Sequence, residues 1–143
     1  FFDFCCLGFF SVDAGLGSSF FGSSTGLVSG MNLIAGEQEK CEIVDYLEEY
    51  TPEDLRIAFN QALDNLEDCN GILVFADLEG GLPVKMVSEI ASQNEGIEVI
   101  AGTNLGMLIE ISMARSFVTD LDELVEMAIE TGKTQVNHVE IRD

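Results

Sequence analysis

Basic residues are scarce in this chain, and their scarcity excludes several functions. Only 6 residues are lysine or arginine, against 26 acidic residues, so the formal net charge of the 143-residue chain is −20. A surface this acidic repels the phosphates of nucleic acids and the headgroups of anionic lipids. We therefore expect no nucleic-acid partner and no direct binding to a membrane surface.

Histidine and paired metal ligands are scarce as well. The chain has one histidine, His138, and its four cysteines form no C-x-x-C pair, so we expect no zinc site. Cys41 and Cys69 adjoin apolar runs and are interpreted as reduced core residues of a cytosolic protein. No stretch reaches the ~18 apolar residues of a membrane span. The apolar first residues lack the basic region of a signal peptide, so we do not predict one.

The length predicts a single domain, 1–143, but its composition is divided into two zones. Residues 1–36 contain no Lys, Arg or Glu, yet they hold seven of the ten phenylalanines and seven of the fourteen glycines. Residues 1–26 form the most atypical segment. The glycine-rich stretch 15–26 lacks the lysine of a phosphate-binding loop, so that motif is excluded.

The remaining sequence alternates between strand and helix patterns. Apolar runs predict strands at 41–46, 71–76 and 97–101. Periodic or capped segments predict helices at 27–35, 51–67, 83–93, 105–115 and 119–132, with Thr51/Asp54 and Thr119/Asp122 as capping boxes. A last strand is expected at 134–141, and a first strand at either 4–12 or 13–19. This order predicts an open, mostly parallel, doubly wound α/β sheet of about five strands flanked by helices.

Two turns in this pattern are candidate ligand-binding elements, because open α/β sheets bind ligands beyond the carboxyl ends of their strands. One turn runs from Asp77 through Gly80, Gly81 and Leu82, and the other comprises Gly102, Thr103 and Asn104. Glycines allow close backbone approach, and the following helix offers free N–H groups to an anion. Asp77 is interpreted as orienting a catalytic group, as binding a cation, or simply as capping its turn. His138 is interpreted as an ordinary exposed residue of the last strand.

Several segments together resemble a known family. They are 32–39 (NLIAGEQE), 73–83 (LVFADLEGGLP), 99–110 (VIAGTNLGMLIE), 114–115 (AR) and 130–133 (ETGK). Across about residues 27–141, the chain is similar to the EIIA domain of the mannose-family sugar phosphotransferase system. The resemblance implies a cytoplasmic homodimer in which the last strand is exchanged between subunits.

The resemblance also implies an activity. Family members accept a phosphoryl group on a histidine from the phosphocarrier HPr and pass it to an EIIB domain, which phosphorylates the incoming sugar. No metal or organic cofactor takes part, and the membrane is met only indirectly, through the EIIC/EIID transporter. Asp77 corresponds to the carboxylate that fixes the tautomer of the histidine. The turns at 80–82 and 102–104 would flank the phosphoryl group.

The chain departs from the family pattern at the acceptor itself. Alignment on the Gly26-Leu27 pair places Phe20 at the histidine position, and phenylalanine has no nucleophilic nitrogen. Leu82, Lys85 and Gly106 also replace the usual serine, asparagine and proline. Three hypotheses account for the missing histidine. Residues 1–26 differ from the authentic sequence, or the protein is a non-catalytic EIIA-like binding or regulatory module, or His138 substitutes. A dihydroxyacetone-kinase phosphocarrier subunit has a similar fold but needs a histidine too.

Overall fold

The centre of the molecule is a four-stranded parallel sheet. The computed structural model describes residues 5–12, 23–47 and 49–142, with only the backbone at 5–12 and Ser23. The sheet order is β2-β1-β3-β4, formed by Cys5–Val12 (β1), Glu42–Tyr46 (β2), Ile72–Ala76 (β3) and Ile97–Ala101 (β4). The prediction of an open parallel sheet is confirmed, and the first strand is the earlier of the two alternatives. The other alternative, 13–19, lies outside the described residues.

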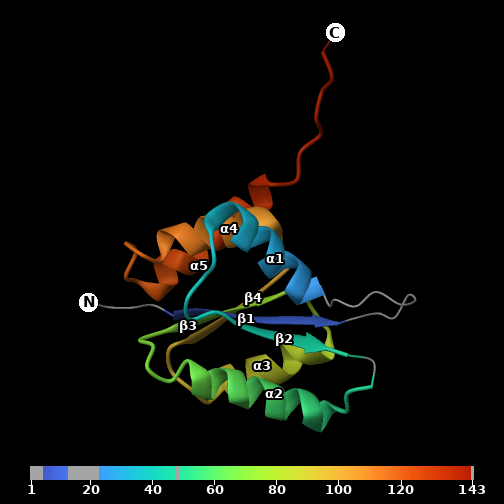
Figure 1. Ribbon diagram of the computed structural model, residues 1–143, viewed down its shortest axis with the longest axis vertical. Helices are drawn as coiled ribbons and strands as arrows, with labels where there is room; N and C mark the ends of the chain where they lie inside the picture. The colour runs from blue at the N-terminus through green and yellow to red at the C-terminus, as the bar shows by residue number, and fades with distance from the viewer. Residues whose placement is uncertain (1–4, 13–22, 48, 143) are drawn as a thin grey trace.

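Five helices cover the two faces of the sheet among the described residues (Figure 1). On one face lie α1 (Ser23–Ala35), α4 (Leu105–Ala114) and α5 (Leu121–Thr134). On the other lie α2 (Pro52–Asn65) and α3 (Leu82–Ser92). Each predicted helix is present, although α1 begins at Ser23, ahead of the predicted 27.

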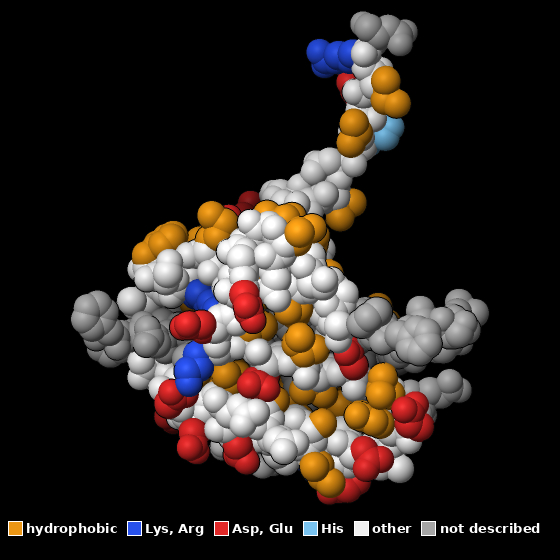
Figure 2. All heavy atoms as spheres, viewed as in Figure 1, with side chains coloured by type: hydrophobic (Ala, Val, Ile, Leu, Met, Phe, Trp, Pro, Cys, Tyr) orange, Lys and Arg blue, Asp and Glu red, His pale blue; other side chains and the backbone are white. Residues whose placement is uncertain are grey.

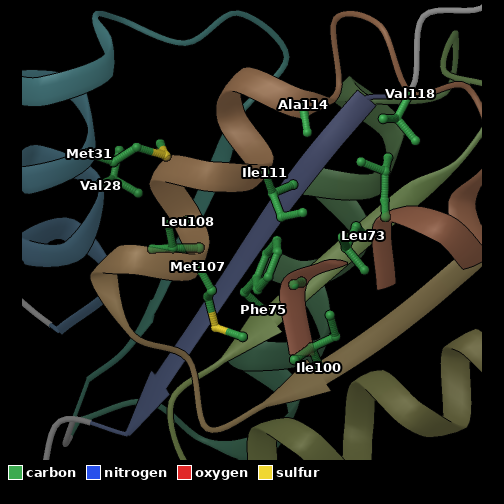
Figure 3. Close-up of a cluster of buried hydrophobic side chains, with 12 residues drawn as sticks. Val28, Met31, Leu73, Phe75, Ile100, Met107, Leu108, Ile111, Ala114 and Val118 are labelled. Carbon is green, nitrogen blue, oxygen red and sulfur yellow. The ribbon is translucent and has the colours of Figure 1, made fainter. Parts of the chain in front are cut away.

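The strand β3 is apolar throughout because both of its faces are covered by helices. Leu73 and Phe75 are fully buried against α1, α4 and α5, where Ile111 of α4 packs over them (Figure 3). Val74 points to the opposite face and joins the core beneath α2 and α3, together with Phe59. The two cores hold β3, and with it the turn that follows, at the centre of the sheet.

One predicted capping box is confirmed and the other is wrong. The hydroxyl oxygen of Thr51 accepts from the N–H of Asp54 at 3.2 Å, and the Asp54 carboxylate accepts from the N–H of Thr51 at 2.9 Å. At α5 the N-cap is Asp120 and not Thr119. Its Oδ1 accepts from the N–H groups of Asp122 at 2.9 Å and of Glu123 at 3.2 Å. The carboxylate satisfies two free helix donors at once, which explains why the N-cap lies one residue later than predicted.

The predicted last strand is absent from the described chain, so the sheet has four strands where about five were expected. The helix α5 continues to Thr134, and residues 135–142 then extend away from the body (Figure 1). Their apolar side chains remain exposed: Val136, Val139 and Ile141 are 85%, 79% and 92% accessible. A strand needs a neighbour to satisfy its backbone groups, and this segment has none within the described part of the chain.

Cys41 and Cys69, which the sequence predicts to be reduced core residues, differ in their oxidation state. Cys69 is disulfide-bonded, so the prediction of a free thiol there is wrong. Cys41 is a free thiol, and burial raises its pKa to about 11, although the nearby Arg115 guanidinium opposes part of that rise. None of the helices in the described ranges has the length and apolar character needed to span a bilayer.

Candidate functional site

At β1 the chain reverses the direction in which it adds strands to the sheet, so the carboxyl end of β1 is a topological switch point. The chain passes from β1 to β2 on one side, whereas β3 and β4 lie on the other. The register pairs Val12 with Tyr46 of β2 and Phe10 with Ala76 of β3. Ligands of open α/β sheets bind in the crevice at this kind of switch point. The residues that follow β3 and β4 therefore define the candidate site.

Asp77 follows β3 directly at this switch point and is half-buried. Its Oδ1 accepts a hydrogen bond from the N–H of Leu78 at 2.8 Å, so the carboxylate shapes its own turn. That is the simplest of the three interpretations of Asp77. The location beside β1 also suits the interpretation that it orients a catalytic group.

The Gly80–Leu82 turn leads into α3 without a capping side chain. Gly80 has a φ of +85°, a conformation that favours glycine. Gly81 is the N-cap of α3 and supplies no side-chain hydrogen bond to the first turn. Helix N–H groups without a capping side chain are suited to an anion. Leu82 opens the helix with an exposed side chain and contributes no hydroxyl.

The second turn is bonded to the end of β3, directly before the first turn. Gly102 has a φ of +79°, and the next residue, Thr103, donates twice to the carbonyl oxygen of Ala76. Its N–H lies 3.1 Å from that oxygen and its hydroxyl 2.7 Å. Asn104 caps α4 by accepting from the N–H of Met107 at 3.2 Å, and its amide donates to the Gly132 carbonyl at 2.9 Å. The two predicted turns and the end of α5 therefore meet at one edge.

The other predicted site residues are not brought to this edge. His138 is exposed on the C-terminal segment beyond α5. Phe20 lies outside the described residues. Conversely, sequence reasoning missed Thr25 of α1, whose hydroxyl donates to the Asp45 carboxylate of β2 at 2.5 Å. The available signal was the position of Asp45, an acid near the carboxyl end of a predicted strand.

The surface around this scaffold is acidic. On the face shown in Figure 2, red Asp and Glu side chains are frequent and blue Lys and Arg side chains are few. With a net charge of −20, the chain is suited to partners that present a basic surface.

The fold is a doubly wound α/β domain in which the turns after β3 and β4 lie at the switch-point edge of the sheet. Residues 23–129 match the family described as PTS system fructose IIA component, EIIA-man. Over 110 residues the chain is 37% identical to the PTS system mannose-specific EIIAB component of Escherichia coli K12, a match that covers 77% of this chain. It covers 34% of that relative, so the chain spans about a third of its length. The chain belongs to the mannose-type EIIA family of the sugar phosphotransferase system.

Solved structures agree with this assignment. The phosphotransferase system component EIIA from Streptococcus agalactiae aligns with a TM-score of 0.79 and 25% identity, covering 94% of this chain and 96% of that one. The mannose/sorbose specific IIA subunit from Enterococcus faecalis aligns with a TM-score of 0.82 over 98% of both chains, at 23% identity. The second similarity establishes the shared fold alone.

Proposed function

We propose that this chain has the scaffold of a phosphocarrier of the sugar phosphotransferase system, which, with a histidine at position 20, relays a phosphoryl group in the cytoplasm from HPr to an EIIB domain. The observation that carries the proposal is the double hydrogen bond from Thr103 to Ala76. It holds the Gly102 turn against the end of β3, beside Asp77. The start of α3, which has no capping side chain, would then offer its N–H groups to the phosphoryl oxygens.

The chemistry of the relay requires few groups. A neutral imidazole nitrogen attacks the phosphorus of the donor phosphohistidine, and one N–P bond forms as the other breaks. The donor ring, protonated on its second nitrogen, leaves as neutral imidazole, and the accepting ring keeps its single N–H. Asp77 would hold the remaining N–H of the accepting ring, which fixes the tautomer and stabilises the charge that develops. Helix N–H groups would stabilise the phosphoryl oxygens, so no metal or organic cofactor is required.

Residue 20 decides whether this relay operates. A histidine there completes the site, whereas Phe20 of this sequence offers no nitrogen for phosphate. With Phe20 the second candidate function applies, namely a non-catalytic EIIA-like module that binds its partners without transferring phosphate. The replacement of the usual serine by Leu82 favours the second candidate too, since it removes a hydroxyl donor from the turn.

The C-terminal segment supports assembly as a homodimer. Residues 135–142 leave the body with three exposed apolar side chains and no neighbouring strand among the described residues (Figure 1). Exchange of this segment with a second copy would satisfy its backbone and bury those side chains. Sedimentation should show a dimer that becomes monomeric when residues 135–143 are deleted. A dimer that survives the deletion would contradict the exchange.

Binding and phosphate transfer are tested separately. With an isotope-labelled chain, addition of HPr or of an EIIB domain should shift the amide signals of 77–82 and 102–104. Absence of binding to both partners would overturn the proposed function. With phosphoenolpyruvate, enzyme I and HPr, the Phe20 chain should remain unlabelled, and its Phe20→His variant should take up acid-labile phosphate. Label on the Phe20 chain that disappears in His138→Gln would assign the acceptor to His138 and contradict both candidates.

A further inference from the structure

The first turn of α1 is attached to β2 by two successive side chains. The hydroxyl of Thr25 donates to the Asp45 carboxylate at 2.5 Å. The neighbouring Ser24, which is only 2% exposed, donates from its hydroxyl to the carbonyl oxygen of Val44 at 3.4 Å. Charge-assisted hydrogen bonds of the first kind are about twice as strong as neutral ones. The start of α1 is therefore fixed to the carboxyl half of β2.

The strand register relates this attachment to Asp77. Asp45 of β2 pairs with Ser11 of β1, and on the other side Ala76 of β3 pairs with Phe10. Asp77, one residue further, is thus level with Ser11. Asp45 and Asp77 therefore lie on opposite sides of the end of β1, at the same level along the strand direction. The bond to Thr25 shows that Asp45 faces α1, so the helix begins beside the switch point.

Resting on the proposed function, we infer that Thr25 and Asp45 are positioning residues for phosphoryl transfer. Their hydrogen bond fixes the start of α1, which immediately follows residue 20 and its neighbours in the chain, relative to Asp77. Neither residue touches the phosphoryl group. Precise placement matters, because a shift of about 1 Å in a reacting group can reduce a rate about 100-fold.

The hydrogen bond from Thr25, and not the charge of Asp45, fixes the start of α1, and conservative variants separate the two effects. Asp45→Asn keeps an oxygen that accepts from Thr25 but has no charge, and Thr25→Ser keeps the hydroxyl donor. Asp45→Ala and Thr25→Val remove the bond. All four are made in the Phe20→His background, which supplies the accepting nitrogen.

The rate of phosphate transfer from phosphorylated HPr is measured against HPr concentration. Asp45→Ala and Thr25→Val should lower the maximal rate about 10- to 100-fold while the KM for HPr stays the same. Asp45→Asn and Thr25→Ser should stay within about 2-fold of the parent. An undiminished rate in Asp45→Ala would overturn the inference, and so would a loss in Asp45→Asn as large as that in Asp45→Ala.

Amide hydrogen exchange tests the same bond without phosphate. Exchange in the first turn of α1 should accelerate in Thr25→Val and Asp45→Ala but not in their conservative counterparts, while exchange in α5 stays constant in all four. If Phe20→His takes up no phosphate, the proposed function fails and the positioning role fails with it, whereas this measurement still shows whether the Thr25–Asp45 bond fixes the start of α1. Unchanged exchange at α1 in Thr25→Val would overturn it.

Discussion

Thr103 joins the turn after β4 to the end of β3, since both its hydroxyl and its backbone N–H donate to the carbonyl oxygen of Ala76, at 2.7 and 3.1 Å. Ala76 is the residue before Asp77, so this contact fixes the second glycine turn with respect to the carboxylate. The relative position of the two turns thus depends on a side chain that bears no charge.

Replacement of Thr103 by valine removes the hydroxyl bond and preserves the shape of the side chain. We expect the free energy of unfolding to fall by about 1 kcal/mol, the net value of one intramolecular hydrogen bond. Thr103→Ser keeps the donor and should lose less. Urea denaturation measures both, and a valine variant as stable as the parent would show that the hydroxyl bond contributes nothing.

Alanine substitutions should have opposite effects at Gly80 and Gly26. A Cβ at either position meets no atom within 4 Å, so crowding does not distinguish them. Gly80 has a φ of +85°, which costs about 1–2 kcal/mol for an L side chain, and Gly80→Ala should destabilise by that amount. Gly26 lies in α1, and Gly26→Ala should stabilise by about 0.5–1 kcal/mol. Equal changes in thermal stability would contradict the backbone conformation at Gly80.

The contribution of Asp54 to stability, through the start of α2, should depend on pH. Its carboxylate accepts from the N–H and the hydroxyl of Thr51, which hold its pKa below the usual value. A depressed pKa in the folded state contributes stability above the unfolded pKa of about 4, and this is lost as pH falls through the folded pKa.

The urea midpoint of the parent should therefore exceed that of Asp54→Asn by a constant amount near neutral pH. This difference should shrink between about pH 5 and 3. Glu53→Gln, in the same turn, controls for the change in net charge. An advantage that stays constant down to pH 3 would show that the Asp54 carboxylate is not stabilised by Thr51.

Much of the fold follows from local sequence, and some of it does not. The run 71–76 predicts β3 because a strand between two helical layers must be apolar on both faces. The Gly80 and Gly102 turns were predictable since glycine favours positive φ. The Thr25–Asp45 bond joins residues 20 positions apart and appears only once α1 packs beside β2. The disulfide at Cys69 likewise depends on tertiary proximity.

The C-terminal segment shows another limit of local patterns. Residues 134–141 have the alternation of a strand, yet the structure continues α5 to Thr134 and leaves the rest unpaired. A strand pattern states which face would be buried, but not which chain supplies the neighbour. The prediction of a strand therefore failed for the single chain.

The most direct test of the account is the rate of phosphate transfer from phosphorylated HPr to the Phe20→His chain with and without the Asp77 carboxylate. Asp77→Asn preserves the size of the side chain and removes its charge. The account predicts that Phe20→His is labelled and that adding Asp77→Asn lowers the rate about 100-fold or more. A Phe20→His chain that stays unlabelled, or a double variant that transfers phosphate as fast as Phe20→His alone, would contradict the placement of the phosphoryl site beside Asp77.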